Sequence, residues 1–295
     1  MHAIFQPGFF SNGPVQLALV VGALVAVVSA VVGTFTVIRG QSFAGHSLAD
    51  IGTTGGSAAY LLGTSALYGF VVSNLMAAGA MELIGVRRAR GRDVATGIVL
   101  SAALGLAALF LYWDTTTTTT TGATVSVLFG SIFTLSSSLV PVMAVLAAIA
   151  LGLTLLLYRP LLLSSLSSDL AAAQGIPVRL VGVVYLLVVA LAVSLSAIAI
   201  GAILSTALLI GPPAAALRLV KRTGAAMVAG ALVGIVATWL GVLLAYDSAA
   251  WTSGHRGWPV SFFVVAVVFV TYLLAQLVAG LRRRRRPVAR GAGGA

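Results

Sequence analysis

Long apolar segments follow one another along almost the whole chain, and this feature limits most strongly what the chain can fold into. A membrane-spanning helix needs about 20 apolar residues. Only 8% of the 295 residues are charged, against about 25% in soluble domains, so a water-facing surface cannot be built. We therefore predict an all-α, polytopic membrane protein with about nine transmembrane helices. Their approximate positions are 15–38, 42–62, 65–85, 94–112, 139–157, 179–199, 200–217, 224–245 and 259–280.

The basic residues gather at the ends of these apolar segments. Lys and Arg outnumber Asp and Glu by 17 to 6, and clusters occur at 87–92, 218–222 and 282–286. This distribution is typical of the positive-inside rule, and it argues against nucleic acid as a partner. Nine crossings place all of these clusters on the cytoplasmic side of an inner membrane, with the N-terminus outside and the C-terminus inside. A fold with eight spans, in which 42–62 or 200–217 is re-entrant, is the alternative.

The chain divides into one transmembrane domain, residues 1–280, and a basic tail, residues 281–295, which we expect to be disordered. We expect no cleaved signal peptide, because the first apolar run is too long for one and no basic segment precedes it. The sequence contains no cysteine. Any metal must therefore be bound by oxygen and imidazole ligands.

Two segments interrupt the apolar pattern. Residues 114–137 begin with Asp114 and seven threonines and continue as an apolar stretch, which predicts a solvated outer linker followed by a short interfacial helix. Gly211, Pro212 and Pro213 fall inside the predicted span 200–217. We expect them to break that helix, which is tolerated at membrane depth only where protein or a water cavity covers the break.

A loop on the predicted cytoplasmic side, residues 158–178, has the pattern of a short capped helix. Ser168 or Asp169 can cap its start, Gly175 can end it after Ala171–Gln174, and Pro177 prevents its continuation. Such a helix can dock a partner protein, but it can equally be a simple connector.

The predicted span 42–62 contains two ionisable residues, His46 and Asp50. Their i, i+4 spacing places both on one face of a helix. Imidazole with carboxylate suits Mn, Fe or Zn, and a homodimer could supply two copies of the pair at its two-fold axis. The pair can also be a purely structural one, or a proton relay in a secondary transporter.

The sequence lacks the motif with which a protein binds the phosphates of ATP in a Walker loop. A phosphate-binding Walker loop ends in Gly-Lys-Ser/Thr, whereas the only lysine, Lys221, lies between Val220 and Arg222. If ATP drives transport, hydrolysis must occur on another polypeptide. The three histidines also lie far apart, at 2, 46 and 255, so a His-Glu-x-x-His metalloenzyme is poorly supported.

Six short stretches resemble the membrane subunits of the manganese/zinc/iron (ABC-3) family of ABC importers. They occur in the order expected for that family, at Arg39–Asp50, Gly91–Leu100, Leu128–Ile132, Tyr158–Leu162, Ala171–Val178 and Gly201–Pro212. Many members of the family have Asp first and His four residues later, whereas this chain has His46 first and Asp50 second.

The resemblance implies a homodimeric permease embedded in lipid, with two cytoplasmic ATPase subunits and an extracytoplasmic metal-binding protein. It implies a divalent metal as the transported substrate rather than a bound cofactor. It also implies that His46 and Asp50 bind the metal, and that residues 168–178, including Ser168, Asp169, Ala171, Gly175 and Pro177, couple the permease to the ATPase. A permease for a metal chelate is the nearest alternative within the same class.

Overall fold

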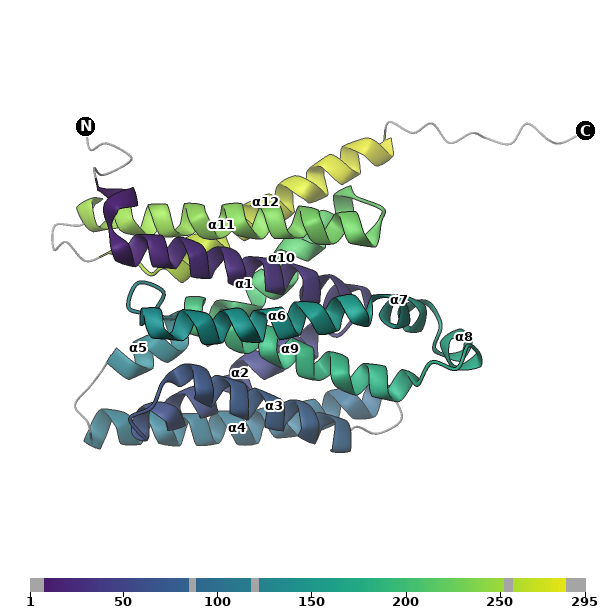
Figure 1. Ribbon diagram of the computed structural model, residues 1–295, viewed down its shortest axis with the longest axis horizontal. Coiled ribbons are helices and arrows are strands. Elements are labelled where there is room, and N and C mark those ends of the chain that lie inside the picture. The colour runs from purple at the N-terminus through teal and green to yellow at the C-terminus, as the bar shows by residue number, and fades with distance from the viewer. Residues whose placement is uncertain (1–7, 85–88, 118–121, 252–256, 285–295) are drawn as a thin grey trace, which may run out of the picture.

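The computed structural model describes residues 8–84, 89–117, 122–251 and 257–284, and every regular element in these ranges is helical, which confirms the all-α prediction. Most of the long helices run along the longest axis of the molecule, and the short helix α5 lies at one end while α7 and α8 lie at the other (Figure 1). The elements in chain order are η1 (Phe9–Ser11), α1 (Gly13–Ile38), α2 (Ser42–Leu61), α3 (Ala66–Ile84), α4 (Ala89–Thr117), α5 (Gly122–Phe129), η2 (Ser137–Leu139), α6 (Val140–Leu156), α7 (Tyr158–Leu166), α8 (Ser168–Ala173), α9 (Val178–Ile200), α10 (Ala202–Leu219), α11 (Thr223–Trp251) and α12 (Val260–Arg284).

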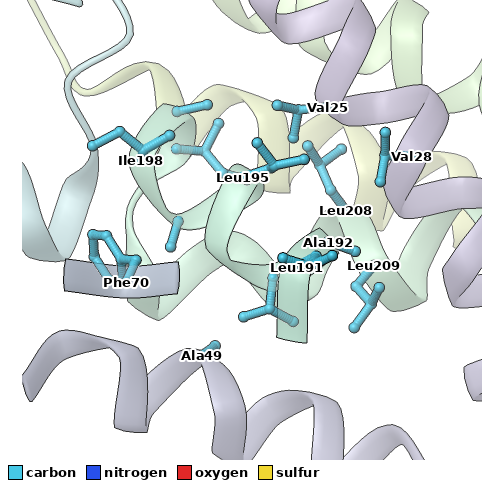
Figure 2. Close-up of a cluster of buried hydrophobic side chains, with 14 of the residues drawn as sticks. Val25, Val28, Ala49, Phe70, Leu191, Ala192, Leu195, Ile198, Leu208 and Leu209 are labelled. Atoms are coloured by element: carbon cyan, nitrogen blue, oxygen red, sulfur yellow. The ribbon is translucent and has the colours of Figure 1, made fainter. Parts of the chain in front are cut away.

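Helix α9 forms the centre of the bundle. Its apolar stretch is 83% buried, and helices α1, α3, α6 and α10 pack around it. Figure 2 shows Leu191 and Leu195 of α9 among Val28 of α1, Leu208 of α10 and Phe70 of α3. A helix that is apolar on all sides is buried by its neighbours, which explains why this segment carries no charged residue after Arg179.

The described helices match the nine predicted spans in position, but not all of them satisfy the requirements for crossing a bilayer. Seven described helices are long and apolar enough to cross: α1, α4, α6, α9, α10, α11 and α12. Helix α2 is long enough but too polar, and the described apolar part of α3 ends at Met81. The count of nine therefore stays a prediction that depends on α2 and α3.

Residues 114–137 differ from the solvated linker that the sequence predicts. Helix α4 continues through Thr117 and includes Asp114, whose side chain is buried. The expected short helix is present as α5, but it packs against protein, since Val127 is fully buried. Residues 118–121 of the threonine run lie outside the described residues.

The expected break at Gly211-Pro212-Pro213 is wrong, because α10 is a continuous helix through both prolines. Proline has no N–H group, so Pro213 cannot donate to the carbonyl group of Leu209 four residues earlier. Gly33 of α1 lies against this carbonyl, so closely that any side chain at Gly33 would collide with it. Neighbouring backbone therefore covers the site where a helix hydrogen bond is missing, as burial in the bilayer requires.

Two glycines bring the end of α5 into backbone contact with the junction between α9 and α10. Gly130 and Gly201 have φ angles of +85° and +89°, which favour glycine. The backbone N–H of Ser131 donates to the carbonyl oxygen of Ile198 at 3.3 Å. Consequently α5 is attached to the C-terminal end of the central helix α9.

The last described helix runs past the predicted domain boundary. We expected a disordered tail from residue 281, but α12 continues through Arg284. Residues 285–295 lie outside the described residues, so the division into a domain and a tail stays a prediction.

Candidate metal site and docking segment

A tight turn directs the chain from α1 into α2. The N–H of Gln41 donates to the carbonyl oxygen of Thr36 at 2.9 Å, and that of Gly40 donates to Val37 at 3.2 Å. This pair of bonds is a Schellman motif, in which the residue after the helix cap adopts a positive φ. Gly40 has a φ of +65°. The turn fixes the point at which α2 begins.

Helix α2 has a closely packed face made of glycines. A side chain at Gly45 would meet Leu209 of α10 at 2.8 Å, and one at Gly52 would meet Phe70 of α3 at the same distance. Small residues let helix backbones approach closely in a membrane protein. This packing accounts for the glycine and other small residues of that face, because a face covered by other helices does not need an apolar surface toward lipid.

His46 and Asp50 lie on the opposite, open face of α2, as the i, i+4 spacing predicts. The Nε2 atom of His46 is 3.6 Å from Oδ2 of Asp50, which is too long for a hydrogen bond. Their side chains are 49% and 22% exposed, so a ligand can reach both. These two atoms do not form a hydrogen bond with each other, so both can bind a third group.

The separation of these atoms suits chelation of one small cation. Imidazole nitrogen and carboxylate oxygen bind Zn²⁺ at about 2.0–2.2 Å. If a cation lay about 2.1 Å from both atoms, the angle from Nε2 through the cation to Oδ2 would be about 120°, close to the tetrahedral value. Among the described residues, no group of three or more His, Asp or Glu side chains is arranged to hold a metal. One chain therefore supplies two such donors at this site.

The segment between α6 and α9 forms two short helices rather than the single predicted one. Helix α8 is capped by Ser167, whose Oγ accepts a hydrogen bond from the N–H of Leu170 at 3.2 Å. The expected caps, Ser168 and Asp169, are wrong, since both lie inside the first turn of the helix.

The end of α8 is formed as predicted. Gly175 has a φ of +76°, and the N–H groups of Gly175 and Ile176 donate to Ala172 and Ala171 at 2.9 and 3.1 Å. These bonds again form a Schellman motif. Pro177 lies next to the start of α9.

The candidate docking segment, residues 168–178, contains α8 and lies at one end of the bundle (Figure 1). Ser168, Asp169, Gly175 and Pro177 are exposed, whereas Ala171 is fully buried and attaches α8 to the rest of the protein. Leu170 of α8 is an exposed apolar side chain, and so is Leu166 at the end of α7. The segment thus offers an exposed, partly apolar surface.

The structure adds three residues that the sequence did not single out for a role at this site. Arg39 is only the first residue of a stretch that resembles the family, and Tyr185 and Thr36 lie outside all six stretches. Yet the hydroxyl groups of Thr36 and Tyr185 are 2.8 Å apart across 149 residues of sequence. Contacts over such a sequence separation leave no local pattern that one sequence could reveal.

Comparison with known proteins agrees with this architecture. The family model of the ABC 3 transport family matches residues 13–278. The manganese transport system membrane protein MntC of Halalkalibacterium halodurans is 28% identical over 252 residues, covering 84% of this chain and 85% of the relative. The chelated iron transport system membrane protein YfeD of Yersinia pestis is 27% identical over 272 residues, covering 92% and 88%.

A solved structure supports the same fold. PsaBC from Streptococcus pneumoniae, in complex with Fab, superposes with a TM-score of 0.78 at 24% identity, covering 94% of this chain and 95% of that one. The family match spans nearly all of the described bundle, including α2 and the docking segment. The resemblance found in the sequence is thereby confirmed, and the chain belongs to the ABC 3 transport family.

Proposed function

We propose that this chain is the transmembrane permease subunit of an ATP-binding-cassette importer for a divalent metal cation, Mn, Zn or Fe. The observation that carries the proposal is the open His46–Asp50 pair on α2, in a bundle of the ABC 3 transport family. Ionisable residues in membrane segments are costly and usually mark a transport path. The names of the relatives, manganese and chelated iron transport proteins, support the substrate class.

The cation would bind between two copies of the chain. His46 and Asp50 of one copy provide two donors, and a second copy related by a two-fold axis would provide two more. Four nitrogen and oxygen donors suffice for a first-row divalent ion, with or without water. Binding must also be weak enough for release, because a conducting site has to pass its ion on. The exposure of the open face of α2 supports this arrangement.

ATP hydrolysis would occur on separate cytoplasmic subunits. The sole lysine is not part of a Walker loop. The docking segment would bind these subunits. Its exposed residues Ser168, Asp169, Gly175 and Pro177 would be available for contact, while the buried Ala171 would hold α8 against the rest of the protein. An extracytoplasmic metal-binding protein would deliver the cation at the opposite end, where α5 lies. In this orientation the N-terminus would lie outside the inner membrane and the C-terminus in the cytoplasm.

The test is reconstitution of the permease with its ATPase and capture protein in liposomes. The proposal predicts that Mn²⁺ crosses the liposome membrane toward the side of the docking segment. This transport should occur only when ATP is present on that side. A variant complex whose ATPase lacks its Walker lysine serves as the control. Uptake that needs a proton gradient but no ATP would contradict the proposal and favour a secondary transporter. Uptake of a ferric chelate in preference to free cations would identify a chelate permease instead.

A further inference from the structure

A hydrogen bond links α7, the helix that precedes the docking segment, to the turn that starts α2. The guanidinium group of Arg39, the last residue before the turn at Gly40, donates through Nη1 to Oγ of Ser164 at 2.8 Å. Ser164 belongs to α7, and its own hydroxyl donates to the carbonyl oxygen of Leu161 at 3.2 Å. Arg39 therefore contacts the helix that leads directly into α8.

Arg39 also contacts the central helix. Its guanidinium carbon lies 5.6 Å from the centre of the Tyr185 ring, within the range of a cation–π interaction. The Tyr185 side chain is fully buried, and its hydroxyl donates to the carbonyl oxygen of Val32 at 2.8 Å. The hydroxyl groups of Thr36 and Tyr185 form a 2.8 Å hydrogen bond, and the Thr36 hydroxyl also lies 3.3 Å from the same Val32 carbonyl oxygen.

Thr36 in turn lies against the start of α2, the helix that contains His46 and Asp50. Its carbonyl oxygen accepts the bond from Gln41 that closes the turn. Its methyl group is 3.7 Å from the position that a Cβ atom would occupy at Gly45, the residue before His46. A chain of direct contacts thus runs from Ser164 through Arg39, Tyr185 and Thr36 to α2.

A role of Arg39 in anchoring the cytoplasmic side of the membrane would not alone explain this geometry. A positive charge near a helix C-terminus is favourable even when it is surrounded by water, and cytoplasmic anchoring requires no particular partner. Arg39 is instead only partly exposed, and it bridges α7 and α9. Hydrogen bonds in buried networks are stronger than in water and resist independent movement of their members.

We propose that Arg39, Thr36 and Tyr185 form a relay that transmits movement of the docking segment to His46 and Asp50. The inference rests on the proposed function, because it assigns the ATPase to the docking segment and the cation to α2. In this relay Arg39 is a positioning residue that moves the start of α2 when α7 moves. Its loss uncouples ATP hydrolysis from transport without removing either partner.

The test compares Ser164→Ala and Tyr185→Phe with the parental complex in liposomes. Both variants remove one hydroxyl group and add no bulk. Each should still co-purify with the ATPase and hydrolyse ATP, but Mn²⁺ transported per ATP should fall about tenfold, the factor expected from one hydrogen bond to a charged or buried partner. Ser165→Ala is the matched control, because the hydroxyl of Ser165 donates to Leu161 within its own helix α7. This variant should leave the ratio unchanged.

A second measurement, backbone hydrogen exchange, does not depend on transport of Mn²⁺. Hydrogen exchange of the backbone amides at 39–45 should slow when the ATPase binds the parental permease, and this change should be lost in Ser164→Ala. A parental ratio of Mn²⁺ to ATP in both hydroxyl variants, or an equal fall in Ser165→Ala, would overturn the relay. Failure of the parental complex to transport Mn²⁺ would overturn the proposed function instead, and the exchange measurement would still decide whether docking reaches the turn.

Discussion

The contact between Gly130 and the α9–α10 junction gives a stability prediction whose size can be worked out from the structure. In Gly130→Ala, the new Cβ atom would lie 2.5 Å from both the carbonyl oxygen of Ala199 and the backbone nitrogen of Gly201. Ordinary contact begins near 3.4 Å, so the two backbone segments must separate by about 0.9 Å, the difference between these distances. That movement would lengthen the 3.3 Å hydrogen bond from Ser131 to Ile198 beyond its useful range.

Three terms then add up. A left-handed backbone costs a non-glycine residue about 1–2 kcal/mol, overpacking costs about 1–3 kcal/mol, and the lost hydrogen bond costs about 1 kcal/mol. We therefore expect Gly130→Ala to lower the free energy of unfolding by about 3–6 kcal/mol. The measurement is equilibrium unfolding of the purified permease in mixed micelles, followed by circular dichroism.

Two other glycines separate these terms. Gly175 has a positive φ but nothing within 4 Å of its Cβ position, so Gly175→Ala should lose only the backbone term, about 1–2 kcal/mol. Gly152, inside α6, has neither a positive φ nor a close neighbour, and Gly152→Ala should gain up to about 1 kcal/mol from helix propensity. Equal losses at Gly130 and Gly175 would refute the argument from backbone contact.

The other predictions concern topology and docking. A cysteine placed at Thr115 in this cysteine-free chain should react with an impermeant maleimide from outside the cell, and one at Leu170 only from the cytoplasm; the reverse pattern would contradict the orientation. Gly175→Val should weaken co-purification with the ATPase by about tenfold or more without changing membrane insertion, because a β-branched residue resists the positive φ that ends α8. Unchanged co-purification would count against docking at α8. The isolated chain should show no ATP hydrolysis above a lipid blank, and hydrolysis that follows the purified chain through gel filtration would contradict a separate ATPase.

Much of the helical architecture could be predicted because apolar runs of spanning length have few other solutions in a bilayer. The predicted starts and ends of α1, α2 and α9 agree with the structure to within two residues. The pairing of His46 with Asp50 was also accessible, since it depends only on helical periodicity within one element. The prediction that the pair binds metal stays a prediction.

Contacts between elements could not be predicted in the same way. Gly130 and Gly201 both occur in stretches that resemble the family, but nothing in either stretch indicates that they meet. The continuity of α10 through two prolines depends on the close approach of Gly33 of α1. The cap of α8 was misassigned because Ser167, Ser168 and Asp169 have similar preferences for that position, and only the folded backbone distinguishes them.

The central claim is that His46 and Asp50 together bind the transported cation. The most direct measurement is ATP-driven Mn²⁺ uptake by the reconstituted complex with His46→Ala, Asp50→Asn and the exchanged pair His46→Asp with Asp50→His. The account predicts that each single variant loses uptake by at least about tenfold while assembling normally, as expected when one donor of a shared site is lost. The exchanged pair, which has the order of ligands found in many members of the family, should restore a substantial part of the uptake. Parental uptake by both single variants would show that the pair is structural and would contradict the account.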